Sequence, residues 1–114
     1  MYTIYHYPQC RKSRAGLQFL KEKGVQFDVV DYMNIPLTAK VMEMLLVKLN
    51  CKPIDLVRKQ EEYFQRSLKG KNFEDHEWIK IILNHPKLLQ RPIVEARYKA
   101  VIGNPVENIE TLLK

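Results

Sequence analysis

The sequence predicts an α/β fold in which a four-stranded mixed sheet is interrupted by an all-helical insertion. Residues 1–32 have the patterns of a strand, a helix and a second strand. Residues 33–88 carry helical patterns alone, and residues 90–114 return to two strands and a final helix. A chain of 114 residues can bury a core without disulfides or metals, so we expect residues 1–114 to form a single domain.

The first part of the chain predicts a βαβ unit. Residues 1–7 are rich in β-branched and aromatic side chains, which favours a strand. Ser13–Lys23 has a recurring apolar face and a basic last turn before Gly24, which is typical of a helix and its end. Val25–Tyr32 predicts a second strand, parallel to the first. The start of the helix then lies at the C-terminal edge of the sheet, where ligands of open α/β folds bind.

The insertion, at about residues 33–88, is expected to be entirely helical. Pro36–Asn50 has apolar residues at three- and four-residue spacing, with Thr38 or Asn34 as the cap, and the helix ends before Pro53. Further helical segments are expected at Pro53–Arg58, at Glu61–Leu68 and, capped by Asp75, up to His85.

The last part of the chain predicts a hairpin and a helix. Gln90–Glu95 and Tyr98–Gly103 are strand-like and close in sequence, so we expect them to pair as antiparallel strands. Pro105 is expected at the first position of a final helix that reaches Lys114. Together with the βαβ unit, this order of elements is the topology of the thioredoxin fold.

Cys10 is the strongest candidate for a reactive residue. It follows a strand and a Pro-containing turn, at a predicted helix start, with Arg11, Lys12 and Arg14 close behind. The free N–H groups and positive dipole of a helix start, together with these cations, lower the pKa of a thiol. Ser13 is expected either to cap the helix or to donate a hydrogen bond to the thiolate. The alternative is a buried cysteine with no reactive role.

Other cysteine and histidine chemistries fit less well. Ser13 takes the place of a second cysteine in a C-x-x-C motif, so a thiol from another molecule would have to resolve any intermediate. Cys51 ends an apolar helix and is expected to be structural. The Cys-x₅-Arg pattern of phosphatases is absent after Cys10, and the three histidines are too scattered for a zinc site. His6 is left with two readings, a residue that tunes the thiol or a strand-end histidine without a role.

Two arginines are candidates for binding an anion. Arg58 lies between two helical segments, and Arg91 directly precedes Pro92 at a predicted strand start. A proline that opens the third strand of this topology is expected to be cis and to face Cys10, with Arg91 pointing at the same pocket. Two guanidinium groups and a helix N-terminus around a thiolate would form a pocket for a tetrahedral oxyanion.

Composition and charge limit the classes of function. The net charge is +6, but the basic residues are spread along the chain and accompany no known nucleic-acid-binding motif, so we expect no direct nucleic-acid binding. No apolar run is long enough to span a membrane, and the first residues lack a leader pattern. Two cysteines do not make a disulfide framework. We therefore expect a cytoplasmic protein that does not bind membranes.

Four stretches resemble one family. Residues 5–14 (YHYPQCRKSR) resemble the active-site stretch of the glutaredoxin-coupled arsenate reductases (ArsC-like) and their Spx relatives. Residues 56–59 (LVRK) resemble the central arginine motif of that family. Residues 89–94 (LQRPIV) and 99–103 (KAVIG) resemble its C-terminal signature. The resemblance covers essentially the whole chain, in order, including the helical insertion.

The resemblance implies a glutathione- and glutaredoxin-dependent oxidoreductase without a bound cofactor or metal. Cys10 would attack arsenate, glutathione would attack the adduct, and glutaredoxin would recycle the mixed disulfide. The predicted catalytic residues are Cys10, Arg11 and Ser13, and the predicted substrate-binding residues are Arg58, Arg91, Pro92 and Arg14. The substrate would be an oxyanion or a glutathione-linked thiol.

The sequence departs from the family pattern at two positions. Asn104 stands where these reductases usually carry a third arginine, which weakens the case for arsenate, and Arg97 on the hairpin turn is a replacement that we do not favour. Tyr7 stands where Asn usually precedes the proline. The alternative function is a non-catalytic, Spx-like regulator that docks on RNA polymerase, although Ser13 breaks the C-x-x-C switch of those proteins.

Overall fold

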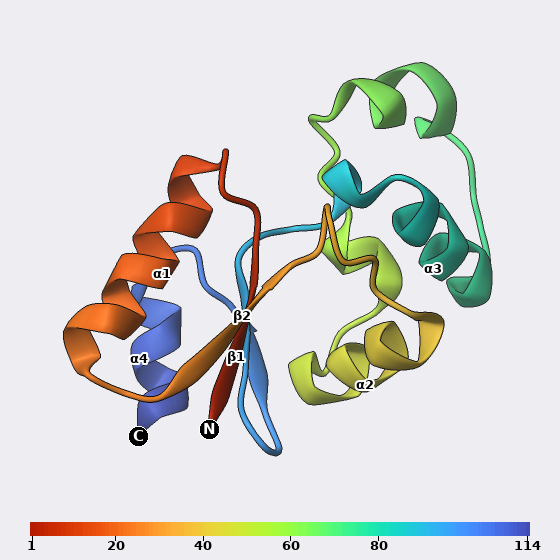
Figure 1. Cartoon of the computed structure of the whole chain (residues 1–114). Helices are drawn as coiled ribbons and strands as arrows, with labels where there is room; N and C mark the ends of the chain where they lie inside the picture. The colour runs from red at the N-terminus through yellow and green to blue at the C-terminus, as the bar shows by residue number, and fades with distance from the viewer. The chain divides into compact units, whose positions relative to one another are not determined.

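The computed structural model describes all 114 residues, which divide into two compact units (Figure 1). The first unit comprises Met1–Ile35 and Arg91–Lys114, and the second comprises Pro36–Gln90. The bounds of the second unit nearly match those of the insertion, which was expected at about residues 33–88. That the two units together form a single domain stays a prediction.

The first unit is built on a four-stranded mixed sheet with strand order β2-β1-β3-β4. Its strands are β1 (Tyr2–His6), β2 (Phe27–Asp31), β3 (Ile93–Glu95) and β4 (Ala100–Ile102). The central strand β1 runs parallel to β2, whereas β3 is antiparallel to both β1 and β4. The expected fold class and thioredoxin-type topology are confirmed.

Two helices, α1 (Arg11–Lys23) and α4 (Glu107–Leu113), cover one face of this sheet (Figure 1). Gly24 ends α1 with a positive φ of 69°, as its sequence predicts. An ion pair between Lys23 and Glu110 joins the two helices at 2.8 Å. The buried core between sheet and helices comprises Ile4, Leu20, Val94, Ile109 and Leu112.

The start of the final helix was predicted wrongly. Pro105 is not its first residue, because α4 begins at Glu107 and the Asn104–Pro105 peptide bond is cis. The N–H of Asn108 donates to the carbonyl of Pro105 at 3.0 Å. This bond spans three residues, as in a 3₁₀ turn, whereas a bond of an α-helix spans four. The Asn108 side chain also donates to the carbonyl of Ile102 at 3.0 Å, which ties this turn to the end of β4.

The second unit contains α2 (Ala39–Leu49) and α3 (Asp75–Asn84). The hydroxyl of Thr38 accepts the N–H of Val41 at 3.1 Å, which confirms Thr38 as the cap of α2. Shorter segments are 3₁₀ turns at Pro53–Leu56 and Pro86–Leu88 and a π turn at Phe64–Leu68.

Two expectations for this unit were wrong in detail. Asp75 is the first residue of α3 and not its cap, because Glu74 caps the helix and its N–H donates to the Glu77 carboxylate at 2.9 Å. The unit is also not entirely helical, since Val57 and Leu89 form an antiparallel bridge. This bridge brings the segment that contains Arg58 beside the end of the unit.

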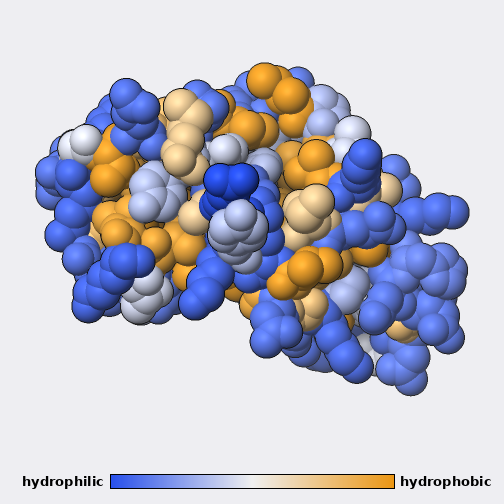
Figure 2. All heavy atoms as spheres, turned by 90° about the horizontal axis from the view of Figure 1, so that it is seen from below, coloured by the Kyte–Doolittle hydropathy of each residue, from blue (hydrophilic) through white to orange (hydrophobic).

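The surface mixes apolar and polar side chains. On the face drawn in Figure 2, hydrophobic residues lie among hydrophilic ones. Large exposed apolar side chains come from distant parts of the sequence, namely Met1, Val29, Ile35, Met44, Val47, Tyr63 and Tyr98. None of the helices combines the length and apolar character that crossing a membrane requires.

Candidate active site around Cys10

Cys10 caps the N-terminus of α1 from the turn that follows β1. Its backbone is extended (φ −94°, ψ 123°), and its carbonyl accepts the N–H of Arg14 at 3.0 Å. Its own N–H donates to the carbonyl of Tyr7 at 3.0 Å, which closes the Pro-containing turn. The thiol, which is half-buried, therefore lies where the first N–H groups of the helix are unpaired.

The surroundings of the sulfur favour its anionic form. Burial raises the pKa of the Cys10 thiol, but hydrogen bonds from the backbone of Ser13, from the Arg91 side chain and from the backbone of Lys12 lower it. The positive charge of Arg91 lowers it further, and the net result is a pKa below the ordinary value. A thiol with these partners is poised to act as a nucleophile.

The basic side chains after Cys10 are not among the groups that lower its pKa, although the sequence predicted that they would be. Arg11 and Lys12 are exposed, and neither side chain is among the groups that lower the pKa of Cys10. Arg14 donates from Nη1 to the carbonyl of Pro8 at 2.9 Å and so braces the turn. Catalytic use of Arg11 and substrate binding by Arg14 stay predictions.

Ser13 joins β1 to α1 through His6. Its side chain is fully buried, and its Oγ lies 2.6 Å from Nδ1 of His6 and accepts the N–H of Tyr7 at 2.9 Å. The Ser13 hydroxyl thus neither caps α1 nor is needed for the bond to Cys10, which comes from the Ser13 backbone. His6 is also buried, and its bond to Ser13 places its ring next to the first turn of α1.

The pKa of His6 is lowered. Burial is the main cause, Asp31 opposes it, and the charges of Arg14 and Lys21 add to it. The ring is therefore neutral near pH 7, and a neutral ring can accept the Ser13 O–H at Nδ1.

Arg91 and Pro92 open β3 at the same edge of the sheet. Ile93 pairs with Tyr5 near the end of β1, so the residues just before Ile93 lie on the side of the sheet where Cys10 is found. The Arg91–Pro92 peptide bond is cis, as expected, and the Arg91 side chain is 7% exposed.

Two glycines make room for the Pro92 ring. A Cβ on Gly16 of α1 would lie 2.7 Å from Cγ of Pro92, and one on Gly103 would lie 3.0 Å from the same atom. The N–H of Gly103 also donates to the Pro92 carbonyl at 2.7 Å. The sequence did not predict this packing role for either glycine, although an isolated glycine inside a helical pattern such as Gly16 often marks close packing.

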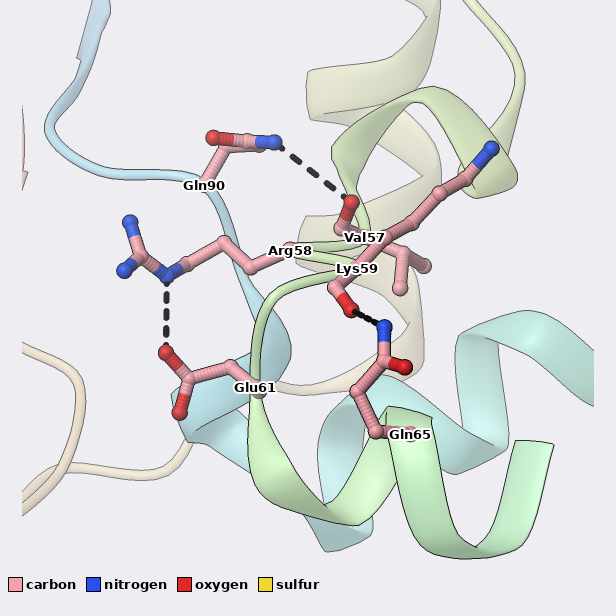
Figure 3. A network of polar contacts seen from close by, with 6 residues as sticks. All are labelled: Val57, Arg58, Lys59, Glu61, Gln65 and Gln90. Carbon is pink, nitrogen blue, oxygen red and sulfur yellow. Dashed lines mark hydrogen bonds and ion pairs between the residues drawn. The ribbon is translucent and has the colours of Figure 1, made fainter. Parts of the chain in front are cut away.

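Arg58 lies in the second unit, and Figure 3 shows its surroundings. Its Nε donates to Oε2 of Glu61 at 3.0 Å, and its two terminal nitrogens turn away from that carboxylate. Its backbone N–H donates to the Leu88 carbonyl at 2.6 Å. The neighbouring Val57 carbonyl accepts from the Gln90 side chain at 3.4 Å. Arg58 is thus held at a fixed place in its own unit, and its approach to Cys10 stays a prediction.

Arg97 lies far from Cys10. The register pairs Glu95 with Thr3, so the β3–β4 turn that carries Arg97 lies at the opposite end of the sheet from Cys10. Its guanidinium instead stands 5.3 Å from the ring centroid of Tyr98. Asn104 does lie at the Cys10 end, because it follows Ile102, the partner of Ile93.

Cys51 is a poor candidate for a second reactive thiol. It follows α2, is half-buried, and its N–H donates to the Leu46 carbonyl at 3.3 Å. Burial raises its pKa, and the charge of Asp55 raises it further. Both effects keep the thiol protonated, in keeping with a structural role. No group of three or more His, Cys, Asp or Glu side chains is placed to hold a metal ion.

Comparison with known proteins identifies the family. The ArsC family profile matches residues 5–112. The chain is 38% identical over 112 residues to an arsenate reductase from Neisseria meningitidis, covering 96% of each chain. It is 39% identical over 108 residues to the uncharacterized protein YfgD of Escherichia coli, covering 93% of this chain and 91% of that one. The structure of an arsenate reductase from Vibrio cholerae superposes with a TM-score of 0.86 at 29% identity, over 96% of this chain and 95% of that one. The chain belongs to the ArsC family.

Proposed function

We propose that the protein is a thiol-dependent reductase in which Cys10 is the nucleophile and the substrate is an oxyanion or a glutathione-linked thiol. Glutathione is the proposed co-substrate and glutaredoxin the proposed partner, and both imply a cytoplasmic location. Arsenate is the first substrate to test, because the relatives from N. meningitidis and V. cholerae are named arsenate reductases.

The observation that carries the proposal is the arrangement around the Cys10 sulfur. Backbone N–H groups of α1 and the Arg91 guanidinium lower the pKa of the thiol, which favours the nucleophilic thiolate form. The same donors would stabilise the negative oxygens of a substrate that approaches the sulfur. Arg91, Arg58 and Arg14 are the cations that we propose for substrate binding, and Pro92 is the fourth residue that we propose for it.

The proposed reaction is a two-electron reduction. The Cys10 sulfur bonds to arsenic and displaces hydroxide, which leaves as water. The glutathione sulfur then bonds to the Cys10 sulfur while the sulfur–arsenic bond breaks, and the electron pair of that bond stays on arsenic. Arsenic passes from As(V) to As(III) and leaves as arsenite, and the two sulfurs are oxidised to a mixed disulfide. Two electrons from glutaredoxin and glutathione restore the Cys10 thiol.

Turnover of arsenate with glutathione and glutaredoxin tests the proposal. We expect the unmodified protein to turn over and the Cys10→Ser variant to fall to background, because a hydroxyl is not ionised near neutral pH. Cys51→Ser is the matched control, and it should keep the activity because the raised pKa of Cys51 keeps that thiol protonated. Asn104→Arg should lower the KM for arsenate, since it adds a cation at the Cys10 end of the sheet.

Three results would change the conclusion. Activity in Asn104→Arg alone would mean that the fold keeps the thiol but has given up arsenate. Loss of activity in Cys51→Ser as well as in Cys10→Ser would contradict a single nucleophile. A complex with RNA polymerase that survives Cys10→Ala, without any turnover, would support the non-catalytic regulator instead.

A further inference from the structure

Tyr7 lies between the end of β1 and the Cys10 turn, and its ring faces the Arg91 guanidinium. The distance from Cζ of Arg91 to the ring centroid is 4.7 Å, which is within the range of a cation–π interaction. Arg91 is 7% exposed, and such contacts strengthen when water is excluded. The cation beside the thiol is therefore in contact with an aromatic face.

The Tyr7 ring is itself held in place from three sides. Its backbone N–H donates to Oγ of the buried Ser13 at 2.9 Å. Its hydroxyl donates to Oε1 of Gln9 at 3.1 Å, within the same turn. Its ring centroid lies 6.5 Å from that of Tyr32, a buried residue that follows β2, at an interplanar angle of 51°. These contacts of the backbone, the hydroxyl and the ring place Tyr7 beside the Arg91 guanidinium.

We propose that Tyr7 is a positioning residue that holds the Arg91 guanidinium against the Cys10 sulfur. The inference rests on the proposed function, in which Cys10 is the nucleophile. A long arginine side chain has many rotamers, and a guanidinium that lies over an aromatic ring keeps fewer of them. Arg91 is then already in place when the thiolate forms.

The other charged groups near the helix start have separate partners. Arg14 is bonded to the Pro8 carbonyl, and His6 is bonded to Ser13 and is neutral near pH 7. Asp31 and Lys21 act on His6. Arg91 is the one charged side chain that acts on the Cys10 thiol, so a change in its position should appear directly in the reactivity of that thiol.

The test is the pH profile of Cys10 alkylation by iodoacetamide, measured in the full chain with Cys51→Ser so that one thiol reports. Tyr7→Leu keeps an apolar side chain but removes the aromatic face, and Tyr7→Phe keeps the face but removes the hydroxyl. In Tyr7→Leu we expect the profile to move to higher pH and the rate at neutral pH to fall about threefold. Tyr7→Phe should keep the profile of the parent.

A double-variant cycle separates positioning from a general loss of structure. If Tyr7 acts through Arg91, then Tyr7→Leu should have no further effect on the profile in an Arg91→Gln background. An unchanged profile in Tyr7→Leu, an equal shift in Tyr7→Phe, or the same shift in the Arg91→Gln background would each overturn the proposal. Alkylation reports the thiolate without turnover, so this test keeps its meaning if the arsenate assay shows no activity.

Discussion

At the scale of single residues, backbone N–H groups and the charge of one residue distant in sequence both lower the pKa of Cys10. The N–H groups of Ser13 and Lys12 point at the sulfur because α1 begins there, and Arg91 comes from the other end of the chain. The exposed side chains of Arg11 and Lys12 are in high-dielectric surroundings, where a charge has little effect. The groups that lower the pKa of Cys10 are therefore the backbone at the start of α1 and the Arg91 side chain, and not the neighbouring basic side chains that were expected to do so.

His6 should make the stability of the protein depend on pH. Its pKa is lowered in the folded chain, so the unfolded chain binds a proton at a higher pH than the folded one. The free energy of unfolding should then fall as the pH drops below about 6.5, the ordinary value for histidine. Urea unfolding at a series of pH values measures this slope.

A variant separates His6 from the carboxylates that also titrate in acid. His6→Asn keeps a polar side chain near Ser13 but does not titrate, so its unfolding free energy should fall less steeply between about pH 7 and pH 5. Equal slopes for the two proteins would mean that the buried ring is not the group responsible.

The sequence gives the candidate residues but not all of their contacts. Cys10 could be predicted because strand, turn and helix start lie next to one another in the chain. Arg91 and Pro92 could be placed because their strand enters the sheet beside the strand before Cys10. The contacts of Tyr7 and Ser13 could not, because they depend on which side chains the turn buries, and local sequence does not determine that burial.

At the scale of elements, α1 is fitted to the Pro92 ring by the absence of a side chain at Gly16. Alanine is normally the better helix former by about 1 kcal/mol. Here its methyl group would stand 2.7 Å from Cγ of Pro92, with Ile109 next to it at 3.5 Å. Proline has a rigid ring, and the strand behind it cannot easily move, so the helix would have to shift.

Gly16→Ala should therefore lower the free energy of unfolding, by about 1–3 kcal/mol, despite the better helix propensity. Chemical denaturation measures the change. Gln18→Ala, at an exposed position of the same helix, is the control and should change stability by less than about 0.5 kcal/mol. A Gly16→Ala protein as stable as the parent would show that α1 and Pro92 can separate without cost.

Periodicity predicted the strands and helices well and their ends less well. The apolar spacing predicted that α1, α2 and α3 exist. The start of the final helix was predicted less well, because α4 begins two residues after Pro105. Proline is compatible both with a first helical turn and with the turn seen here. The hydrogen bonds of Asn108 distinguish the two, and they depend on the folded structure and cannot be predicted from local sequence. The position of Arg97 far from Cys10 follows from the register of β3 against β1. This register could not be predicted, because the sequence of so short a strand does not specify how it pairs.

At the scale of the whole molecule, the two units raise the question of cooperativity. One is formed by both ends of the chain, and the other is continuous between Pro36 and Gln90. Both have buried cores, represented by Leu20 in the first unit and Leu45 in the second, each 0% exposed. If the two units form a single domain, disruption of either core should unfold both units.

We expect Leu20→Ala and Leu45→Ala each to lower the midpoint of one common unfolding transition, at a cost of about 2–5 kcal/mol. Calorimetry measures it, and the calorimetric and van't Hoff enthalpies should agree for each variant. Two separate transitions, with each substitution moving one of them, would show that the units are independent domains.

The position of β1 at the centre of its sheet has a consequence for the synthesis of the protein. Its partner β2 follows within about thirty residues, but its other partner, β3, is among the last segments to be translated. Until then the nascent chain carries β1 with one open edge, and a Cys10 that has no Arg91 beside it. A polypeptide released before residue 91 would therefore expose a strand edge that invites pairing with other chains, and its thiol would lack the cation that favours the thiolate in the finished protein.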